Sequence, residues 1–259
     1  MPMLQVRGQR INLATRGVRG SGILFLHGLG PGAVVWELVT QGLPEDRRAL
    51  MLEFPGFGES PPAGFAGDID HAATLLHHSL HQANQLDPIP IVAHDYSGLV
   101  ALCFAARYPS HVQRLVLLGS GAFVRDVHSL WTVHERIKMR GWDADAAKRW
   151  LTRGLVEELA DEHLSSMCEA AATADADVVA GCLRAMIGAE YLEASRTIRA
   201  PILVLRGDAD PFVTEDDAAI LTARANNATQ VNVAHAGHWP HLEAPDECRA
   251  AILDFVNAK

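Results

Sequence analysis

The chain has 259 residues, of which 49% are hydrophobic, and it carries a formal net charge of −9. This length and apolar content suit one large domain with its own core. The negative balance, with no cluster of Lys and Arg, excludes a nucleic-acid surface and favours a small, uncharged or weakly charged partner.

Targeting, membrane and metal patterns are absent from the sequence. Residues 1–17 lack the apolar core of a signal peptide, and no run approaches the ~20 apolar residues of a membrane span. The four cysteines have neither CxxC spacing nor clustered His partners, which predicts reduced thiols and no metal site. We therefore expect a soluble, cytoplasmic protein without a cofactor, and the sequence carries no signal for an oligomeric state.

Six short apolar runs mark the predicted strands. In chain order they read GILFLHG, RALMLEFPG, IPIVAHD, RLVLLGS, PILVLRGD and the more polar TQVNVAHAGH. Helical patterns lie between and after them, at residues 71–86, 97–109, 215–225 and 246–258. Continuous apolar runs that alternate with helices indicate parallel strands buried on both faces. The sequence therefore predicts an α/β protein with a doubly wound, mostly parallel sheet.

The third run ends in a turn with a carboxylate at its apex. Residues 92–102 read VAHDYSGLVAL, an apolar strand followed by small residues and the start of a helix. A turn of this kind, in which strand and helix approach closely, holds an exposed nucleophile. Asp95 stands at the apex, where a helix N-terminus stabilises negative charge. We interpret Asp95 as a nucleophile.

Residues 121–197 break the alternation of strands and helices. The segment has helical spacing, three tryptophans and no strand-like run. An insertion after the carboxyl end of a strand lies over the ligand crevice of an open α/β sheet. We therefore expect a helical lid on a core formed by residues 1–120 and 198–259. A helical excursion without a covering role, or a dimer surface, is the alternative.

Two further candidate groups follow the last two predicted strands, where catalytic residues of open α/β sheets gather. The motif GDAD holds Asp208 and Asp210, and HAGHWPH holds three histidines, of which His238 follows a glycine. A carboxylate and an imidazole at this edge can complete a catalytic set with Asp95.

Together these motifs resemble the α/β-hydrolase family over essentially the whole chain. The resemblance rests on HGLGPG, FPGFGES, AHDYSG, LRGDADPFVT and AGHWPHLEAP, which occur in the family's order. Aligned on the family's G-x-S-x-G turn, Asp95 takes the nucleophile's position, with Ser97 as the alternative. The resemblance favours Asp210 over Asp208 as the acid and His238 as the base.

The same resemblance implies an oxyanion pocket and a set of substrate contacts. The pocket's donors are the backbone N–H groups of Leu29 and Tyr96. Apolar and aromatic residues of the insertion predict a small hydrophobic substrate. The side chains expected to contact it are Tyr96, Trp131, Trp142, Tyr191 and Trp239.

The HD pair in the turn around Asp95, called the elbow below, resembles the epoxide-hydrolase and dehalogenase branches of this family. In these, aspartate attacks a saturated carbon and forms an alkyl-enzyme ester, which water activated by His238 and Asp210 would hydrolyse here. Tyr96 stands where both branches commonly carry tryptophan. The elbow also lacks the arginines with which haloacid-type relatives hold a carboxylate, which disfavours that subclass.

Other functions stay open at this point. Asp95 and His238 can act as acid and base in a non-hydrolytic cyclase or lyase reaction. Asp95 can also replace the serine of an ester or lactone hydrolase, or the chain can serve only to bind a ligand.

Overall fold

The structure is a computed structural model that describes residues 3–157 and 159–258. Eight strands form one sheet in the order β1-β2-β4-β3-β5-β6-β7-β8. Strands β3 to β8 are parallel to one another, and β2 is antiparallel to both β1 and β4. The α/β fold with a mostly parallel sheet is therefore confirmed. The strands are β1 (Met3–Val6), β2 (Gln9–Arg16), β3 (Ser21–Leu26), β4 (Arg47–Leu52), β5 (Ile89–His94), β6 (Val112–Leu118), β7 (Ile202–Gly207) and β8 (Ala228–Val233).

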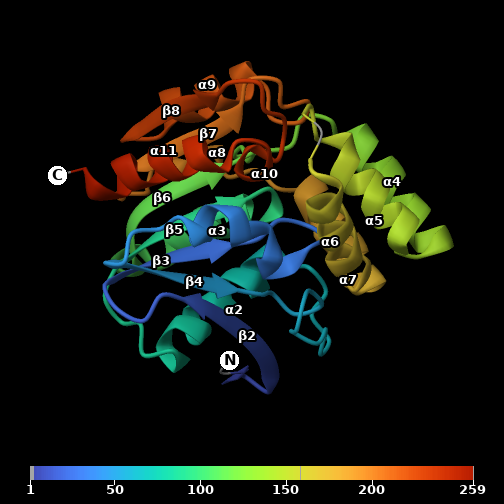
Figure 1. Cartoon of the computed structure of the whole chain (residues 1–259), viewed down its shortest axis with the longest axis horizontal. Helices are drawn as coiled ribbons and strands as arrows, with labels where there is room; N and C mark the ends of the chain where they lie inside the picture. The colour runs from blue at the N-terminus through green and yellow to red at the C-terminus, as the bar shows by residue number, and fades with distance from the viewer. Residues whose placement is uncertain (1–2, 158, 259) are drawn as a thin grey trace.

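Helices cover both faces of this sheet (Figure 1). On one face α1 (Glu37–Gln41) packs against α11 (Pro245–Asn257), and on the other α2 (Ile69–Gln82) packs against α3 (Tyr96–Arg107). The remaining elements outside the insertion are η1 (Gly32–Trp36), η2 (Pro109–His111), α9 (Glu215–Arg224) and α10 (Pro240–Glu243).

The six apolar runs of the sequence form strands β3 to β8. Every residue of β5 and of β7 is buried, which explains why these strands read as continuous apolar runs. Strand β8 is the edge strand and is largely exposed, in keeping with its more polar sequence. Strands β1 and β2, at the opposite edge, were not predicted because they lack a continuous apolar run.

The segment between β6 and β7 is helical. It forms α4 (Val127–Arg140), α5 (Ala144–Arg153), α6 (Asp161–Ala172), α7 (Ala176–Ile187) and α8 (Leu192–Ser195). Asp126, Asp143 and Asp175 cap three of these helices, because each side chain accepts a hydrogen bond from a backbone N–H in the first turn.

Helices α4 to α7 lie beyond the carboxyl edge of the sheet, toward which the arrows of β3 and β4 point in Figure 1. The insertion thus has the helical character and the place that the sequence predicts, while its action as a lid and the division into core and lid stay predictions. Within residues 3–157 and 159–258, no helix is long and apolar enough to cross a bilayer.

Candidate active site

Asp95 alone makes the turn between β5 and α3. Its backbone lies at φ 53° and ψ −124°, a conformation that non-glycine residues rarely adopt and that persists only where the surroundings impose it. A side chain at position 98 would collide with Ser120 Oγ, so α3 follows at once only because Gly98 has none. The strain and the close packing together hold the Asp95 carboxylate at the carboxyl edge of the sheet.

The two oxygens of the Asp95 carboxylate have different partners. The Leu29 N–H donates a hydrogen bond of 3.1 Å to Oδ2, and Oδ1 lies 3.7 Å from His238 Nε2. The loop after β3 comes this close to the carboxylate because Gly28 has no side chain. A Cβ at position 28 would stand only 2.8 Å from the Cβ of Asp95. Leu29 therefore lies where a donor is predicted. Among the described residues no hydrogen bond joins the Tyr96 N–H to the carboxylate, and its part as second donor stays a prediction.

His238 is held by a second carboxylate on its other side. Its Nδ1 lies 3.2 and 3.1 Å from the two oxygens of Asp210. Asp210 also accepts hydrogen bonds from the backbone N–H groups of Phe212 and Val213, at 2.8 and 3.1 Å. Asp208 is exposed instead. The structure thus brings together Asp95, Asp210 and His238, the three residues predicted as a catalytic set.

Charge pairing sets the protonation of this group. Burial disfavours a charge on His238, but Asp210 and Asp95 outweigh burial and raise the pKa of His238 to about 10. Burial acts to raise the pKa of Asp95, and the proximity and charge of His238 reverse this, so that the pKa of Asp95 is lowered. At neutral pH a protonated His238 therefore stands between two ionised carboxylates.

Two neighbouring histidines support the site as neutral groups. Burial, followed by repulsion from His238, lowers the pKa of His94 to about 4, and its Nε2 lies 2.9 Å from the carbonyl oxygen of His238. Burial also lowers the pKa of His27, whose Nε2 accepts a hydrogen bond from the Phe54 N–H. Both rings tie loops beside the site rather than facing the cavity.

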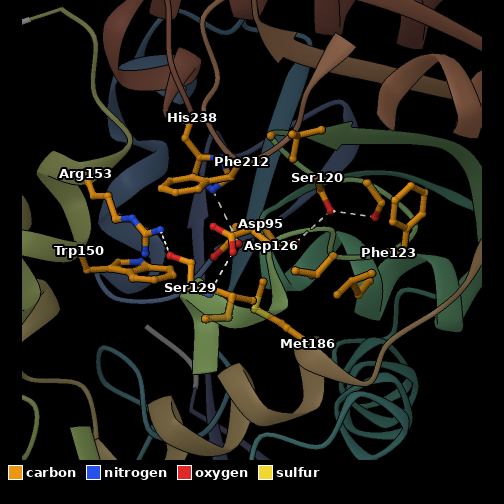
Figure 2. A pocket seen from close by; sticks show the side chains of 16 residues that line it. Asp95, Ser120, Phe123, Asp126, Ser129, Trp150, Arg153, Met186, Phe212 and His238 are labelled. Carbon is orange, nitrogen blue, oxygen red and sulfur yellow. Dashed lines mark hydrogen bonds and ion pairs between the residues drawn. The ribbon is translucent and has the colours of Figure 1, made fainter. Parts of the chain in front are cut away.

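A cavity opens beside Asp95 and His238 (Figure 2). Most of its lining side chains are apolar, namely Leu99, Phe123, Val124, Leu130, Trp150, Met186, Phe212 and Val213. The polar side chains, apart from Asp95 and His238, are Ser120, Asp126, Ser129 and Arg153.

The aromatic residues predicted to bind substrate do not line this cavity. Tyr96 is buried and its hydroxyl donates to the carbonyl of Gly67 at 3.0 Å. Trp142 is buried and its indole N–H donates to the carbonyl of Ala171 at 2.7 Å. Trp239 is buried with its ring centroid 4.5 Å from that of His94. All three serve packing.

The other two residues predicted to contact substrate, Trp131 and Tyr191, also lie outside the lining of this cavity. Trp131 lies on α4 with 46% of its surface exposed, and Tyr191 is half-buried just before α8. Neither belongs to the lining of the cavity beside Asp95. The orientation of a side chain on an inserted helix depends on how that helix packs, which the residue type does not report.

Helix α5 supplies two lining residues that sequence reasoning missed. Trp150 and Arg153 are three positions apart and so share one face of the helix. The indole N–H of Trp150 is buried and has no acceptor among the residues that the structure describes. Arg153 donates to Ser129 Oγ, and its guanidinium lies 4.7 Å from the centroid of the Phe212 ring.

The end of α5 is fixed against His238. The His238 N–H donates to the carbonyl of Gly154 at 2.7 Å, and a Cβ on Gly154 would stand 2.7 Å from the Cβ of His238. The sequence signal for this contact is the glycine directly after the helix, in RWLTRG. Trp150 and Arg153 are thus held at a set distance from His238.

Comparison with known proteins agrees with this architecture. A model of the Alpha/beta hydrolase family matches residues 23–251. The 2-hydroxy-6-oxononadienedioate/2-hydroxy-6-oxononatrienedioate hydrolase 1 of Dechloromonas aromatica is 26% identical, over 92% of this chain and 88% of that protein. The pimeloyl-[acyl-carrier protein] methyl ester esterase of Aromatoleum aromaticum is 28% identical, over 90% of this chain and 97% of that protein.

Solved structures show the same fold. The enol-lactonase from Burkholderia xenovorans has a TM-score of 0.89 at 19% identity, covering 99% of this chain and 100% of that one. The esterase from Exiguobacterium antarcticum has a TM-score of 0.91 at 16% identity, covering 99% of each. None of these four proteins is named as an epoxide hydrolase or a dehalogenase, so the resemblance is confirmed for the family and not for those branches. The chain belongs to the Alpha/beta hydrolase family and is a hydrolase of that fold.

Proposed function

We propose that the protein hydrolyses a small substrate through an alkyl-enzyme ester on Asp95. The observation that carries this proposal is the unequal environment of the two carboxylate oxygens, with Oδ2 on the Leu29 N–H and Oδ1 beside His238. Oδ1 attacks a saturated carbon in the cavity, and the electron pair of the broken bond departs with the leaving group. The oxygen left as the ester carbonyl is Oδ2, which already has a donor for the charge of a tetrahedral intermediate.

Hydrolysis of the ester then depends on a change in the charge around His238. Alkylation neutralises Asp95, which removes one of the two groups that raise the pKa of His238. The imidazolium can then lose its proton to solvent and accept one from the water that attacks the ester carbonyl. Asp210 keeps Nδ1 occupied so that Nε2 faces the ester. The alcohol leaves, and the restored carboxylate of Asp95 contains one oxygen from water.

Trp150 favours a halide as the leaving group. Its indole N–H is a weak donor without an acceptor in the described part of the chain, and the residue lines the cavity of Asp95. A halide leaves without being protonated, whereas an epoxide oxygen needs a proton as its bond breaks. Tyr191 is the one tyrosine in residues 121–197, and it does not line the cavity. These facts favour a carbon–halogen bond over an epoxide.

Arg153 favours a substrate that bears a carboxylate. The guanidinium lies at the cavity, and within residues 3–157 and 159–258 it forms no ion pair with an acidic side chain. The sequence of the turn around Asp95 disfavoured the haloacid-type subclass because it holds no arginine, but α5 brings Arg153 to the same cavity. The curated relatives include hydrolases named for a nonadienedioate and for a substituted succinate, which are also carboxylates. A short halogenated carboxylic acid with an apolar body combines these features.

Hydrolysis of an ester or lactone is the second candidate, because relatives are named as an esterase and an enol-lactonase. Replacement Asp95→Ser tests it directly. Appearance of activity on an activated ester such as p-nitrophenyl acetate in this variant, with none in the parent, would show that the site is arranged for a serine.

Intact-mass spectrometry of the variant His238→Gln tests the proposal. This variant retains Asp95 but cannot activate water, so a halogenated acid should add its carbon skeleton to the protein with loss of halide. Haloalkanes, epoxides and esters complete the panel and identify the leaving group. If the parent turns over a panel member that leaves no adduct on the variant, the alkyl-enzyme ester is contradicted.

A further inference from the structure

A second group of histidines lies at the amino ends of the parallel strands, whereas Asp95 lies at their carboxyl ends. His77 and His81 are one turn apart on α2, and His111 ends η2 directly before β6. Helix α2 ends ahead of β5, so all three lie near the amino ends of the parallel strands, whereas Asp95 follows the carboxyl end of β5. One ring nitrogen from each histidine lies within 4.8 Å of the other two.

The rings are packed in a defined arrangement. The centroid of His77 lies 4.5 Å from that of His81 and 4.9 Å from that of His111. On its other side His77 stacks on Tyr108, with ring centroids 4.1 Å apart and an interplanar angle of 3°. Its Nδ1 is buried and has no hydrogen-bond partner among the described residues. A buried polar atom without a partner is costly, which points to a missing ligand.

The surroundings favour neutral imidazoles. Burial, followed by repulsion from the neighbouring histidines and Arg107, lowers the pKa of His77. Burial and then repulsion from His81 lower the pKa of His111. Arg107 is itself paired with Asp70 at 3.0 Å, which offsets its charge. Neutral imidazole is the form whose lone pair binds a metal ion.

We propose that His77, His81 and His111 bind one divalent transition-metal ion of the class that prefers imidazole nitrogen, such as Zn²⁺. Nitrogens at ~2.0–2.1 Å from a tetrahedral metal stand about 3.3 Å apart, so rotation of the side chains suffices to close the site. His81 is exposed, which gives the ion access and leaves a fourth position for water. The ligands come from α2 and from the segment before β6, so the ion joins two parts of the fold and binds the native state.

Zinc titration of the metal-stripped full chain tests this site. Competition with a chromophoric chelator should give one Zn²⁺ per chain, and the thermal midpoint should rise with Zn²⁺ but not with Mg²⁺. Replacement His81→Gln alters an exposed residue, so the variant should fold and bind Zn²⁺ at least ~10–100-fold more weakly. His111→Gln should have the same effect.

His78→Gln is the matched control, because it follows His77 on α2 and lies outside the cluster. It should bind Zn²⁺ as the parent does. Parent-like affinity in folded His81→Gln and His111→Gln, or no binding by the parent, would overturn the proposal. Loss of binding in His238→Gln instead would assign the ion to the site of Asp95 and equally overturn it.

Discussion

The histidine at the carboxyl ends of the strands and the histidine cluster at their amino ends have different surroundings. His238 lies between two carboxylates, and its pKa is raised to about 10. His77 and His111 lie among other imidazoles, and burial together with like charges lowers the pKa of each. The same residue type is thus the proposed proton carrier at one end of the sheet and a candidate metal ligand at the other. Its chemistry follows from the charge of its partners.

The largest expected effect comes from removing the nucleophile at the carboxyl edge. In Asp95→Asn, the carbon that bears the leaving group has no anionic attacker, and we expect kcat to fall by about 10⁶-fold, the scale seen for loss of a catalytic nucleophile. Steady-state halide release from a halogenated acid measures it, with Asp208→Asn as an exposed control. Activity within tenfold of the parent would mean that Asp95 is not the attacking group.

Removing the carboxylate of Asp210 should slow the hydrolysis of the ester on Asp95, which is the second step of the proposed reaction. Asp210→Asn removes the negative charge that contributes most to raising the pKa of His238. It also leaves Nδ1 of His238 without its carboxylate partner. We expect overall turnover to fall by about 10⁴-fold, with the ester on Asp95 accumulating because water attack is the step that needs His238. Rapid quench followed by intact-mass measurement checks this, and a slow step without accumulated ester would argue against the assigned order.

A smaller effect is expected from Arg153, which lines the cavity. Arg153→Met keeps the length and apolar contact of the side chain but loses the charge, so KM for a halogenated acid should rise ~10–100-fold, as loss of a charged hydrogen bond predicts. KM for a neutral haloalkane should stay unchanged. Arg149→Met, on the same helix but away from this cavity, is the matched control. An equal rise for both substrates would show that Arg153 does not recognise a carboxylate.

The smallest effect concerns stability against pH and contrasts the two histidine groups. Because the pKa of His238 in the folded protein exceeds its ordinary 6.5, its contribution to stability is complete below pH 6.5 and is lost as pH rises through about 10. His77 and His111, with lowered pKa values, contribute stability that is lost as pH falls below 6.5. Urea unfolding at pH 5, 7 and 10 measures both. His238→Gln should flatten the alkaline decline only, and an unchanged decline would contradict the pairing.

The sheet and the grouping of Asp95, Asp210 and His238 were readable from sequence because both are encoded locally. Continuous apolar runs report burial on both faces, and the elbow, GDAD and HAGHWPH motifs each place one side chain at the end of a strand. Strands β1 and β2 lack such runs and appear only through their pairing with β4.

The lining of the cavity was not readable, because it depends on how α4, α5 and α7 pack over the sheet edge. Trp150 faces the cavity and Trp142 does not, although both belong to the same short stretch. The metal-site candidate depends likewise on tertiary proximity. The spacing of His77 and His81 is visible in HHSLH, but His111 joins them only when α2 packs beside the segment that leads into β6.

A single turnover in heavy-oxygen water tests the central claim most directly. With the protein in excess over a halogenated acid, Asp95 should gain one heavy oxygen, located by mass spectrometry of its peptide, and the alcohol formed should carry ordinary oxygen. Heavy oxygen in the alcohol of this first turnover, with none in Asp95, would show that water attacks the substrate directly and would contradict the alkyl-enzyme ester.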